Sequence, residues 1–312
     1  MIKQRWLLAL ITILILAALL VQVDFQAAWQ TLSQARLDYL FACFCLSLTF
    51  PVLSALRWQV IMNRLGAAIT FWNSFRLVMA AWPLGTITPA KSGELVKVLY
   101  LRNTLHYAQT TGIILAERLL DVAFLSLSAL LGGLWLGQPV IAWMGAGVFA
   151  AIAGLNIVSA TPLIERAPPK IRETGQRLLQ ANRALYSHLP TFLAALLFTG
   201  LNWLGSYAQT WLLYLALGTV VPFLYTCSAL PVAIFVGLLP FTISGMGTRD
   251  SAIVFLFEGL ATYETNLAVG ILYSLYGYWL LTLLGIPFMR AAFAGRIEGV
   301  PAESLQQAPQ RS

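Results

Sequence analysis

Residues 83–101 read PLGTITPAKSGELVKVLYL, and residues 239–257 read LPFTISGMGTRDSAIVFLF. Each stretch places a proline, glycines, a basic residue and a carboxylate in a chain that is otherwise strongly apolar. Proline and glycine interrupt regular helices, and an ionised side chain at membrane depth costs about 2.5–3.5 kcal/mol on insertion scales. The rest of the chain shows what kind of protein tolerates two such stretches.

The composition is typical of an integral membrane protein. Of the 312 residues, 59% are hydrophobic and only 10% are charged, whereas soluble domains carry about 25% charged residues. Apolar runs long enough to cross a bilayer recur along the chain. We predict an all-α membrane domain over residues 1–289 with about eight transmembrane helices, followed by a short cytoplasmic tail over residues 290–312.

Run length and helix breakers locate the predicted spans. The continuous spans are expected at residues 6–23, 39–56, 111–136, 139–159, 190–217, 222–241 and 265–289. Shorter or interrupted pieces predict broken or re-entrant helices at residues 71–88, 92–105 and 244–262. The first span follows a basic start, as in a signal peptide, but no small-residue cleavage site follows it, so we expect it to be retained.

Most of the 19 Lys and Arg residues fall on one predicted side of the membrane. This count places Arg57 and Lys97 on that side, together with the basic loop at residues 160–189 and the tail. Because cytoplasmic loops are rich in Lys and Arg, both termini are expected in the cytoplasm. The loop is either an amphipathic helix on anionic lipid or a simple basic connector. The net charge of +7 reflects this topology, and no nucleic-acid partner is predicted.

The first polar cluster combines helix breakers with charges: Pro89, Lys91, Gly93 and Glu94. If a helix begins here, Ser92 would cap it and Glu94 would lie in its first turn, where the helix dipole favours a carboxylate. A broken helix in a bilayer is tolerated where it is buried in protein or lines a cavity. The cluster is therefore either part of a polar site or an interfacial cap with lysines that reach water.

The second cluster is Glu117, Arg118 and Asp121 near the start of a long span. The two carboxylates are four residues apart and share a helix face, and Arg118 can pair with Asp121 three residues later. Such a compensated cluster either binds a ligand or fixes one helix to its neighbours.

The third cluster joins small residues to an adjacent cation and carboxylate: Pro240, Ser244, Gly245, Gly247, Thr248, Arg249 and Asp250. Thr248 would cap a helix and Asp250 would lie in its first turn. Glycines let a backbone approach a ligand closely, and an arginine beside a glycine-rich turn suits an anion such as phosphate. The alternative is a plain turn within the membrane.

The two opening stretches overlay without a gap. Thr86 then falls on Thr242, and Glu94 falls on Asp250. Corresponding interrupted segments in two halves of a chain indicate an internal-repeat transporter with its site between the halves. We therefore expect an internal repeat.

The sequence contains no motif for a P-loop, a catalytic serine elbow or a zinc-binding HExxH helix. We predict no metal, no cofactor and no catalytic residue, and accordingly no enzymatic activity. A membrane-embedded head-group transferase is the least favoured alternative.

The ordered set of motifs resembles the lysylphosphatidylglycerol synthase transmembrane family, a flippase-like family that includes the MprF membrane domains. The resemblance rests on Arg57-Trp58, on Pro89 with Gly93-Glu94, on Glu117-Arg118 with Asp121, and on the stretch from Pro240 to Asp250. It covers nearly the whole chain. Aspartate stands at position 250 where the family more often has glutamate.

The resemblance implies a multi-pass protein of a prokaryotic cytoplasmic (inner) membrane that translocates or binds a charged or glycosylated lipid. Aminoacyl-phospholipids, polyprenyl-linked sugars and hopanoid-type lipids are the implied classes. The chain ends soon after its last predicted span, so we expect no lysyl-lipid synthesis by this protein. The alternative is an accessory subunit that partners a lipid- or glycan-modifying enzyme.

The implied partner is thus a membrane lipid with a phosphate-containing head group. We expect Lys91, Arg118 and Arg249 to attract the phosphate, and Glu94 and Asp250 to orient these cations or bind an amine or hydroxyl. Gly93, Gly245 and Gly247 would admit the head group close to the backbone. The supporting residues would be Arg57, Pro89, Glu117, Asp121, Pro240 and Ser244.

Overall fold

The protein is an all-α membrane protein in the part of the chain that the structure describes. The computed structural model describes residues 12, 14–15, 17–19, 21, 23–64, 69–88, 93–101, 107–160, 168, 172, 176 and 188–293. The predicted first span and central loop, and the tail beyond residue 293, lie mostly or wholly outside these residues, as do Pro89, Lys91 and Ser92.

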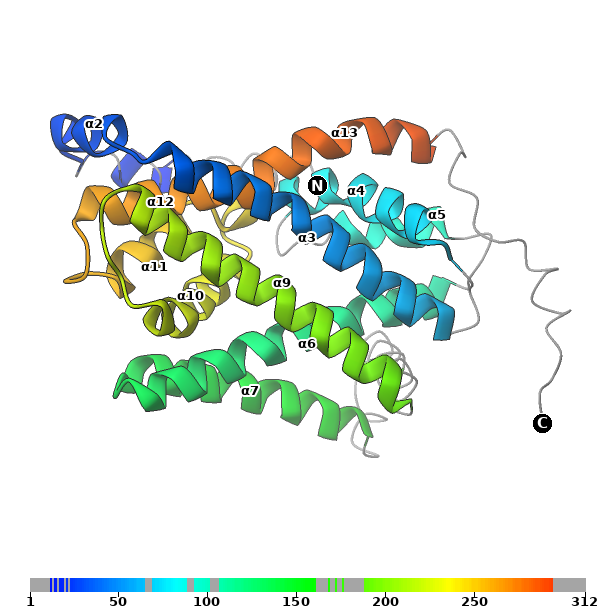
Figure 1. Ribbon diagram of the computed structural model, residues 1–312. Coiled ribbons are helices and arrows are strands. Elements are labelled where there is room, and N and C mark those ends of the chain that lie inside the picture. Colours follow the sequence, from blue (N-terminus) through cyan, green and yellow to red (C-terminus); the bar gives the residue numbers. More distant parts are fainter. Residues whose placement is uncertain are drawn as a thin grey trace, which may run out of the picture.

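Figure 1 shows the helices in chain order. They are α2 (Phe25–Ser33), α3 (Leu37–Arg64), α4 (Phe71–Ile87), α5 (Val96–Tyr100), α6 (Tyr107–Trp135), α7 (Pro139–Ala160), α9 (Leu189–Ala216), α10 (Phe223–Leu238), the 3-10 turn η3 (Ile243–Gly245), α11 (Thr248–Leu256), α12 (Tyr263–Ser274), the π-helix η4 (Leu275–Trp279) and α13 (Leu280–Phe293). The described residues contain no strand, only an isolated bridge between Glu258 and Ala261.

Three helices among the described residues are long and apolar enough to cross a membrane: Leu37–Arg64, Leu189–Ala216 and Tyr263–Arg290. The predicted spans at 190–217 and 265–289 match two of them closely. The predicted span at 39–56 was too short, because the helix continues for two further turns to Arg64. Pro139–Leu155 and Phe223–Leu238 are shorter apolar helices.

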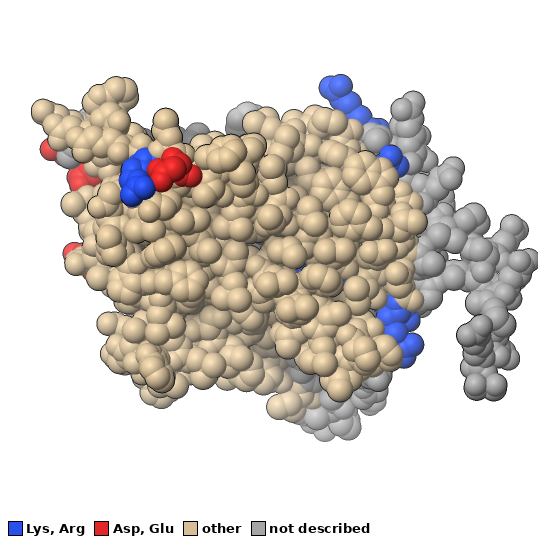
Figure 2. Space-filling model, viewed as in Figure 1, with Lys and Arg blue, Asp and Glu red and all other residues tan. Residues whose placement is uncertain are grey.

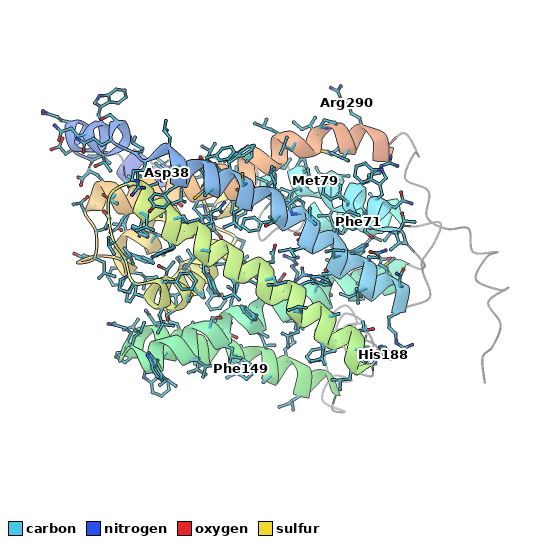
Figure 3. All side chains as sticks on the ribbon, viewed as in Figure 1. Asp38, Phe71, Met79, Phe149, His188 and Arg290 are labelled. Atoms are coloured by element: carbon cyan, nitrogen blue, oxygen red, sulfur yellow. The ribbon has the colours of Figure 1, made fainter. Side chains whose placement is uncertain are left out.

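Charged side chains gather at the two ends of the helices. Figure 2 shows acidic groups toward one end together with a basic group, further basic groups at the other end, and an almost uncharged band between them. Asp38 lies toward the first end, and His188 and Arg290 lie toward the second (Figure 3). Leu and Phe side chains on the band are exposed, among them Phe41, Leu197 and Leu283. An apolar band between charged ends is what a bilayer requires of a spanning domain.

Two helical hairpins enter the protein from opposite ends. The first is α4, a turn and α5, and the second is α10, η3 and α11; they lie toward opposite ends of the long helices (Figure 1). The arms of each hairpin touch at glycine. A Cβ on Gly93 would lie 2.1 Å from the Leu84 carbonyl oxygen, and one on Gly245 would lie 2.7 Å from Gly237 Cα. Glycine is required at both positions because no side chain fits.

The second hairpin contacts the first near the C-terminal end of α4. Ser244 Oγ, at the tip of the second hairpin, donates a hydrogen bond of 2.6 Å to the Thr86 carbonyl oxygen in the first. Ser244 has a left-handed backbone with φ of 55°, which is uncommon for a residue other than glycine. Each hairpin follows a helix of 28 residues, α3 or α9. These two helices pack side by side and run in opposite directions (Figure 1). The segment from α3 to α5 and the segment from α9 to α11 thus form two halves with the same order of elements and opposite orientation.

Apolar packing holds the bundle on both sides of this contact. One cluster of buried side chains includes Tyr207, Tyr214, Leu230 and Phe257. The other is built around Trp58 with residues of α4 and α6. Because lipid tails are as apolar as these side chains, the clusters hold the helices together through close van der Waals packing and not through removal from water.

Candidate functional site: a charged cavity between two hairpins

Arg57 is the centre of a buried ion network. Its side chain on α3 is only 4% exposed, and Nε donates to Glu117 Oε1 at 2.9 Å. Nη1 donates to Asp121 Oδ1 at 2.6 Å and to Thr199 Oγ1 at 2.8 Å. Glu117 and Asp121 both reach Arg57 because four residues on α6 return them to the same face. The network therefore ties α3, α6 and α9 together.

Arg118 and Lys97 extend the network to the first hairpin. Arg118 Nη2 lies 3.2 Å from Asp121 Oδ2 and 3.4 Å from Glu94 Oε2. Lys97 Nζ lies 3.4 Å from Glu94 Oε2 and 4.0 Å from Glu117 Oε2. The Lys97 ammonium also lies over the Trp58 ring, 4.6 Å from its centroid, where a cation–π interaction is favourable. Three cations and three carboxylates thus compensate one another at the centre of the protein.

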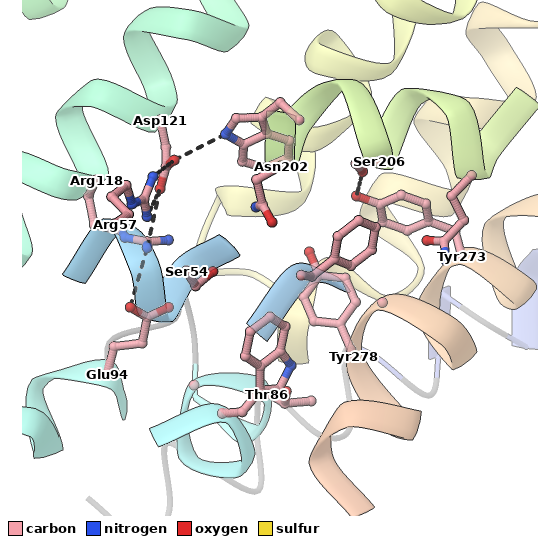
Figure 4. A pocket seen from close by; sticks show the side chains of 16 residues that line it. Ser54, Arg57, Thr86, Glu94, Arg118, Asp121, Asn202, Ser206, Tyr273 and Tyr278 are labelled. Carbon is pink, nitrogen blue, oxygen red and sulfur yellow. Dashed lines mark hydrogen bonds and ion pairs between the residues drawn. The ribbon is translucent and has the colours of Figure 1, made fainter. Parts of the chain in front are cut away.

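A cavity opens beside this network, with one charged wall and one uncharged wall (Figure 4). It encloses about 730 Å³ of space, counting the part that is open at its mouth. The lining residues come from both halves of the chain: Phe50, Ser54, Arg57, Trp82, Gly85, Thr86, Glu94, Arg118, Asp121, Asn202, Trp203, Ser206, Gln209, Tyr273, Gly277 and Tyr278. A smaller hollow adds Lys97 and Glu117 to the charged lining, and the residues that it shares with the cavity are Ser54, Arg57, Trp82, Glu94 and Arg118.

The uncharged wall is a polar stripe on α9. Asn202, Ser206 and Gln209 are four and three residues apart, so they share one helix face toward the cavity. Asn202 projects toward the middle of the cavity in Figure 4, and its Oδ1 has no hydrogen-bond partner. Gln209 donates through Nε2 to the Cys43 carbonyl oxygen and to Ser47 Oγ, which leaves Oε1 without a partner. Among the described residues, this wall therefore holds two buried acceptor oxygens without a partner next to the cavity.

Aromatic groups complete the lining. The indole Nε1 of Trp203 donates to Asp121 Oδ1 at 3.1 Å, which joins α9 to the charged wall. Across the cavity, the Tyr273 hydroxyl lies 3.1 Å from Ser206 Oγ (Figure 4). Tyr278 projects from the π-helix η4, and such segments are frequent at functional sites. Ionised groups, amides and rings together suit a head group with both charge and hydroxyl or amine groups.

The second hairpin carries an ion pair behind this aromatic wall. Arg249 is 1% exposed and pairs with Asp250 at 3.3 Å. Its guanidinium lies against two rings, 4.7 Å from the Tyr273 centroid and 4.9 Å from the Tyr278 centroid, and Nη2 hydrogen-bonds Ser274 Oγ. The Arg249 guanidinium therefore interacts with groups of the protein itself. Neither Arg249 nor Asp250 lines the cavity.

The structure brings together some of the predicted site residues and separates others. Glu94, Arg118, Arg57, Glu117 and Asp121 form one network, and the predicted pairing of Arg118 with Asp121 is confirmed. Arg249 and Asp250 lie at the other hairpin.

The glycines and Pro240 serve the hairpins. Gly93 and Gly245 allow close approach between hairpin arms, and Gly247 has φ of 85° at the start of α11. Pro240 lies in the turn that follows α10.

Three local predictions were wrong. Arg57 does not follow the span but lies inside the helix Leu37–Arg64, and Lys97 lies in α5; both side chains are buried, 3% and 5% exposed. Gly247, and not Thr248, caps α11; Asp250 Oδ2 accepts from the Gly247 N–H at 2.9 Å. Glu94 does not lie in the first turn of an α-helix but in a 3-10 turn before α5, which begins at Val96.

The sequence reasoning missed the stripe Asn202, Ser206 and Gln209 as well as the aromatic lining. The stripe was visible in the spacing of polar residues along a span. Tyr273 and Tyr278 gave no such signal, since aromatic residues are common in membrane helices. The described residues hold no group of three or more His, Cys, Asp or Glu placed to bind a metal ion.

Comparison with known proteins gives one family and two full-length relatives. The family model for the lysylphosphatidylglycerol synthase transmembrane region matches residues 6–285. A UPF0104 membrane protein of Archaeoglobus fulgidus is 25% identical over an alignment of 315 residues, gaps included. The alignment covers 85% of this chain and 95% of the relative. A UPF0104 membrane protein of Methanocaldococcus jannaschii is 22% identical, covering 91% of this chain and 94% of the relative.

Proposed function

Because this chain belongs to the lysylphosphatidylglycerol synthase transmembrane family, we propose that it translocates a membrane lipid whose head group is charged or glycosylated. The head group enters the cavity between the two hairpins, and the tails stay in the bilayer. The observation that carries this proposal is a cavity with one ionised wall within an otherwise almost uncharged band. Ionisable groups at membrane depth are costly and mark transport pathways by default.

The opposed hairpins support translocation in particular. Transporters built from inverted repeats bind substrate between the repeats and expose the site alternately to the two sides. Here helices of matching order run in opposite directions, and the second hairpin contacts the first through Ser244 and Thr86. A change in this contact would open the cavity toward one side or the other.

Arg118 makes the phosphate contact in this proposal. It is the most exposed cation of the network, with 31% of its side chain accessible, and its buried Nε has no hydrogen-bond partner. A guanidinium binds phosphate through two parallel hydrogen bonds, which an ammonium cannot do. The acceptors on Asn202 and Gln209 take hydroxyl or amine donors of the head group.

The wider proposal places the protein in a prokaryotic cytoplasmic membrane, with about eight spans and both termini in the cytoplasm. The basic groups at the end that carries Arg290 (Figures 2 and 3) support this orientation. The protein has no catalytic activity of its own in this proposal.

The test uses purified protein in vesicles that contain a fluorescent phosphatidylglycerol, whose movement between leaflets is followed by chemical quenching of the outer leaflet. Arg118→Gln is expected to slow movement at least tenfold, and Arg118→Lys to restore part of it. Arg36→Gln is the matched control, since Arg36 is exposed and pairs only with neighbours at one end. Equal rates with and without wild-type protein would refute translocation. Stable co-purification with a lipid-modifying enzyme would then favour an accessory role.

A further inference from the structure

The side-chain amide of Gln209 is held in one orientation. Ser47 Oγ donates its hydrogen to the Cys43 carbonyl oxygen at 2.8 Å. Gln209 Nε2 lies 2.9 Å from the same carbonyl oxygen and 2.6 Å from Ser47 Oγ. A carbonyl oxygen only accepts, so a flipped amide would place one acceptor against another. Both hydrogens of the Gln209 amide are therefore used by α3, and Oε1 is fixed as an acceptor.

That acceptor has no donor in the described part of the protein. Gln209 is buried and lines the cavity, and its Oε1 has no hydrogen-bond partner. Asn202, on the same helix face, has a buried Oδ1 that also lacks a partner. Buried polar atoms are normally hydrogen-bonded, and leaving one without a donor is destabilising. Two such atoms beside one cavity indicate donors that come from a ligand.

The polar groups of this wall are spread along α9. Gln209 lies seven residues after Asn202, which corresponds to about 10 Å along a helix. Between them, Ser206 Oγ lies 3.1 Å from the Tyr273 hydroxyl, and this contact uses only one of their two O–H hydrogens. Trp203, next to Asn202, donates to the charged wall, so the stripe begins there and runs away from it.

This spacing distinguishes between hydroxyl and ammonium donors. An ammonium offers all its hydrogens at one point and carries a charge, whereas the hydroxyls of a polyol are neutral and spread over the molecule. A charge withdrawn from water also requires an opposite charge nearby. Among the described residues, the carboxylates that line the cavity are Glu94 and Asp121, both on the charged wall. The uncharged wall therefore matches a polyol.

Resting on the proposed function, we propose that α9 selects a lipid whose head group carries a polyol, a sugar ring or glycerol, beyond its phosphate. The phosphate binds Arg118, and the polyol lies along α9 with its hydroxyls donating to Asn202 and Gln209. Gln209 is a specificity-determining residue because its orientation is fixed and its oxygen accepts whatever ligand is present. A head group without hydroxyls leaves these oxygens unpaired and binds more weakly.

The experiment measures binding of three short-chain lipids to the full-length protein in detergent by calorimetry. The lipids are dioctanoyl phosphatidylinositol, dioctanoyl phosphatidylglycerol and dioctanoyl phosphatidylmethanol. All three are phosphodiesters with one negative charge, and they end in a hydroxylated ring, a glycerol and a methyl group. Wild type should bind at least one polyol lipid about tenfold more tightly than phosphatidylmethanol, as two ordinary hydrogen bonds would provide. The polyol lipid that binds more tightly shows whether a ring or a glycerol is preferred.

Variants assign the preference to α9. Gln209→Met should reduce the preference for the polyol lipid at least threefold. It should leave the affinity for phosphatidylmethanol unchanged within about twofold, because that lipid has no hydroxyl to lose. Asn202→Leu should act in the same way, and its Oδ1 has no internal hydrogen bond to lose. Gln34→Met, an exposed amide on the turn after α2, is the matched control and should keep the full preference.

The outcomes separate this inference from the function on which it rests. Equal affinity of wild type for the three lipids overturns polyol selection and leaves lipid binding intact. A full preference in both Gln209→Met and Asn202→Leu overturns the assignment to α9. Absence of binding to any of the lipids, with no movement in vesicles, refutes the proposed function itself. The comparison on wild type needs no variant, and Asn202→Leu tests the α9 assignment even if Gln209→Met does not fold.

Discussion

Replacing Arg57 with methionine should strongly destabilise the protein. The substitution keeps apolar volume but leaves Glu117 with only Lys97 at 4.0 Å and removes the shortest hydrogen bond to Asp121. Removing one partner of a buried ion pair costs about 3–5 kcal/mol, and the side chains here are at most 6% exposed, so little solvent screening reduces this value. We expect a loss of folding free energy within that range.

A second substitution tests the reasoning behind this number. Arg57→Met combined with Glu117→Met removes one charge of each sign, so the remaining network is neutral again. The double variant should therefore be more stable than the single variant, by about 0.5–3 kcal/mol, the usual range of coupling between contacting residues.

Reversible unfolding in detergent, followed by tryptophan fluorescence, measures both variants. Arg36→Met, at an exposed ion pair, should leave the unfolding transition unchanged. If the double variant is no more stable than the single one, charge compensation does not hold these helices together.

Substitutions at three further positions examine the hairpins and the hydrogen bond from α9 to Asp121. Gly93→Ala should abolish the monodisperse peak in size-exclusion chromatography, because its Cβ would lie 2.1 Å from a facing carbonyl oxygen. The control Gly147→Ala should keep the peak, because nothing lies within 4 Å of the added Cβ. Equal peaks for the two variants would contradict the hairpin packing. Ser244→Ala should lower stability by about 0.5–1.5 kcal/mol through loss of its inter-hairpin hydrogen bond. Ser244→Gly should lower it less, since glycine adopts φ of 55° without strain; the reverse order of unfolding midpoints would argue against a strained tip. Trp203→Phe keeps an aromatic side chain, although a smaller one, and removes the N–H donor to a carboxylate, at a cost of about 1.5–3 kcal/mol for the hydrogen bond; an unchanged midpoint would exclude the indole from the network.

Local features were predictable from the sequence, and contacts between distant segments were not. The pairing of Arg118 with Asp121 depends only on helix periodicity, so three-residue spacing predicted it. The two interrupted segments were also located, because proline and glycine act on the backbone where they stand. Arg57 was predicted to follow the span because the apolar run ends before it, whereas the helix continues to Arg64. Its partners are 60 and 64 residues away, and no local pattern indicates them.

The uncharged wall illustrates a different difficulty. Asn202, Ser206 and Gln209 carry no charge, so the cost of an ionised group at membrane depth does not distinguish them. Their spacing nevertheless places them on one helix face. The grouping of Tyr273 with Tyr278 around one guanidinium depends on a backbone irregularity that sequence periodicity does not reveal.

That irregularity, the π-helix from Leu275 to Trp279, makes a mechanical link between helix register and the aromatic wall. In a regular α-helix, residues five apart point about 140° away from each other, since each residue turns by roughly 100°. Tyr273 and Tyr278 could not then both contact the guanidinium of Arg249. The wider turn brings both rings onto Arg249 and keeps Tyr278 at the cavity. Removing one residue from this turn would rotate α13 about its axis and move one tyrosine ring away from Arg249. Contact of both rings with Arg249 and a regular α-helix over these residues therefore exclude each other.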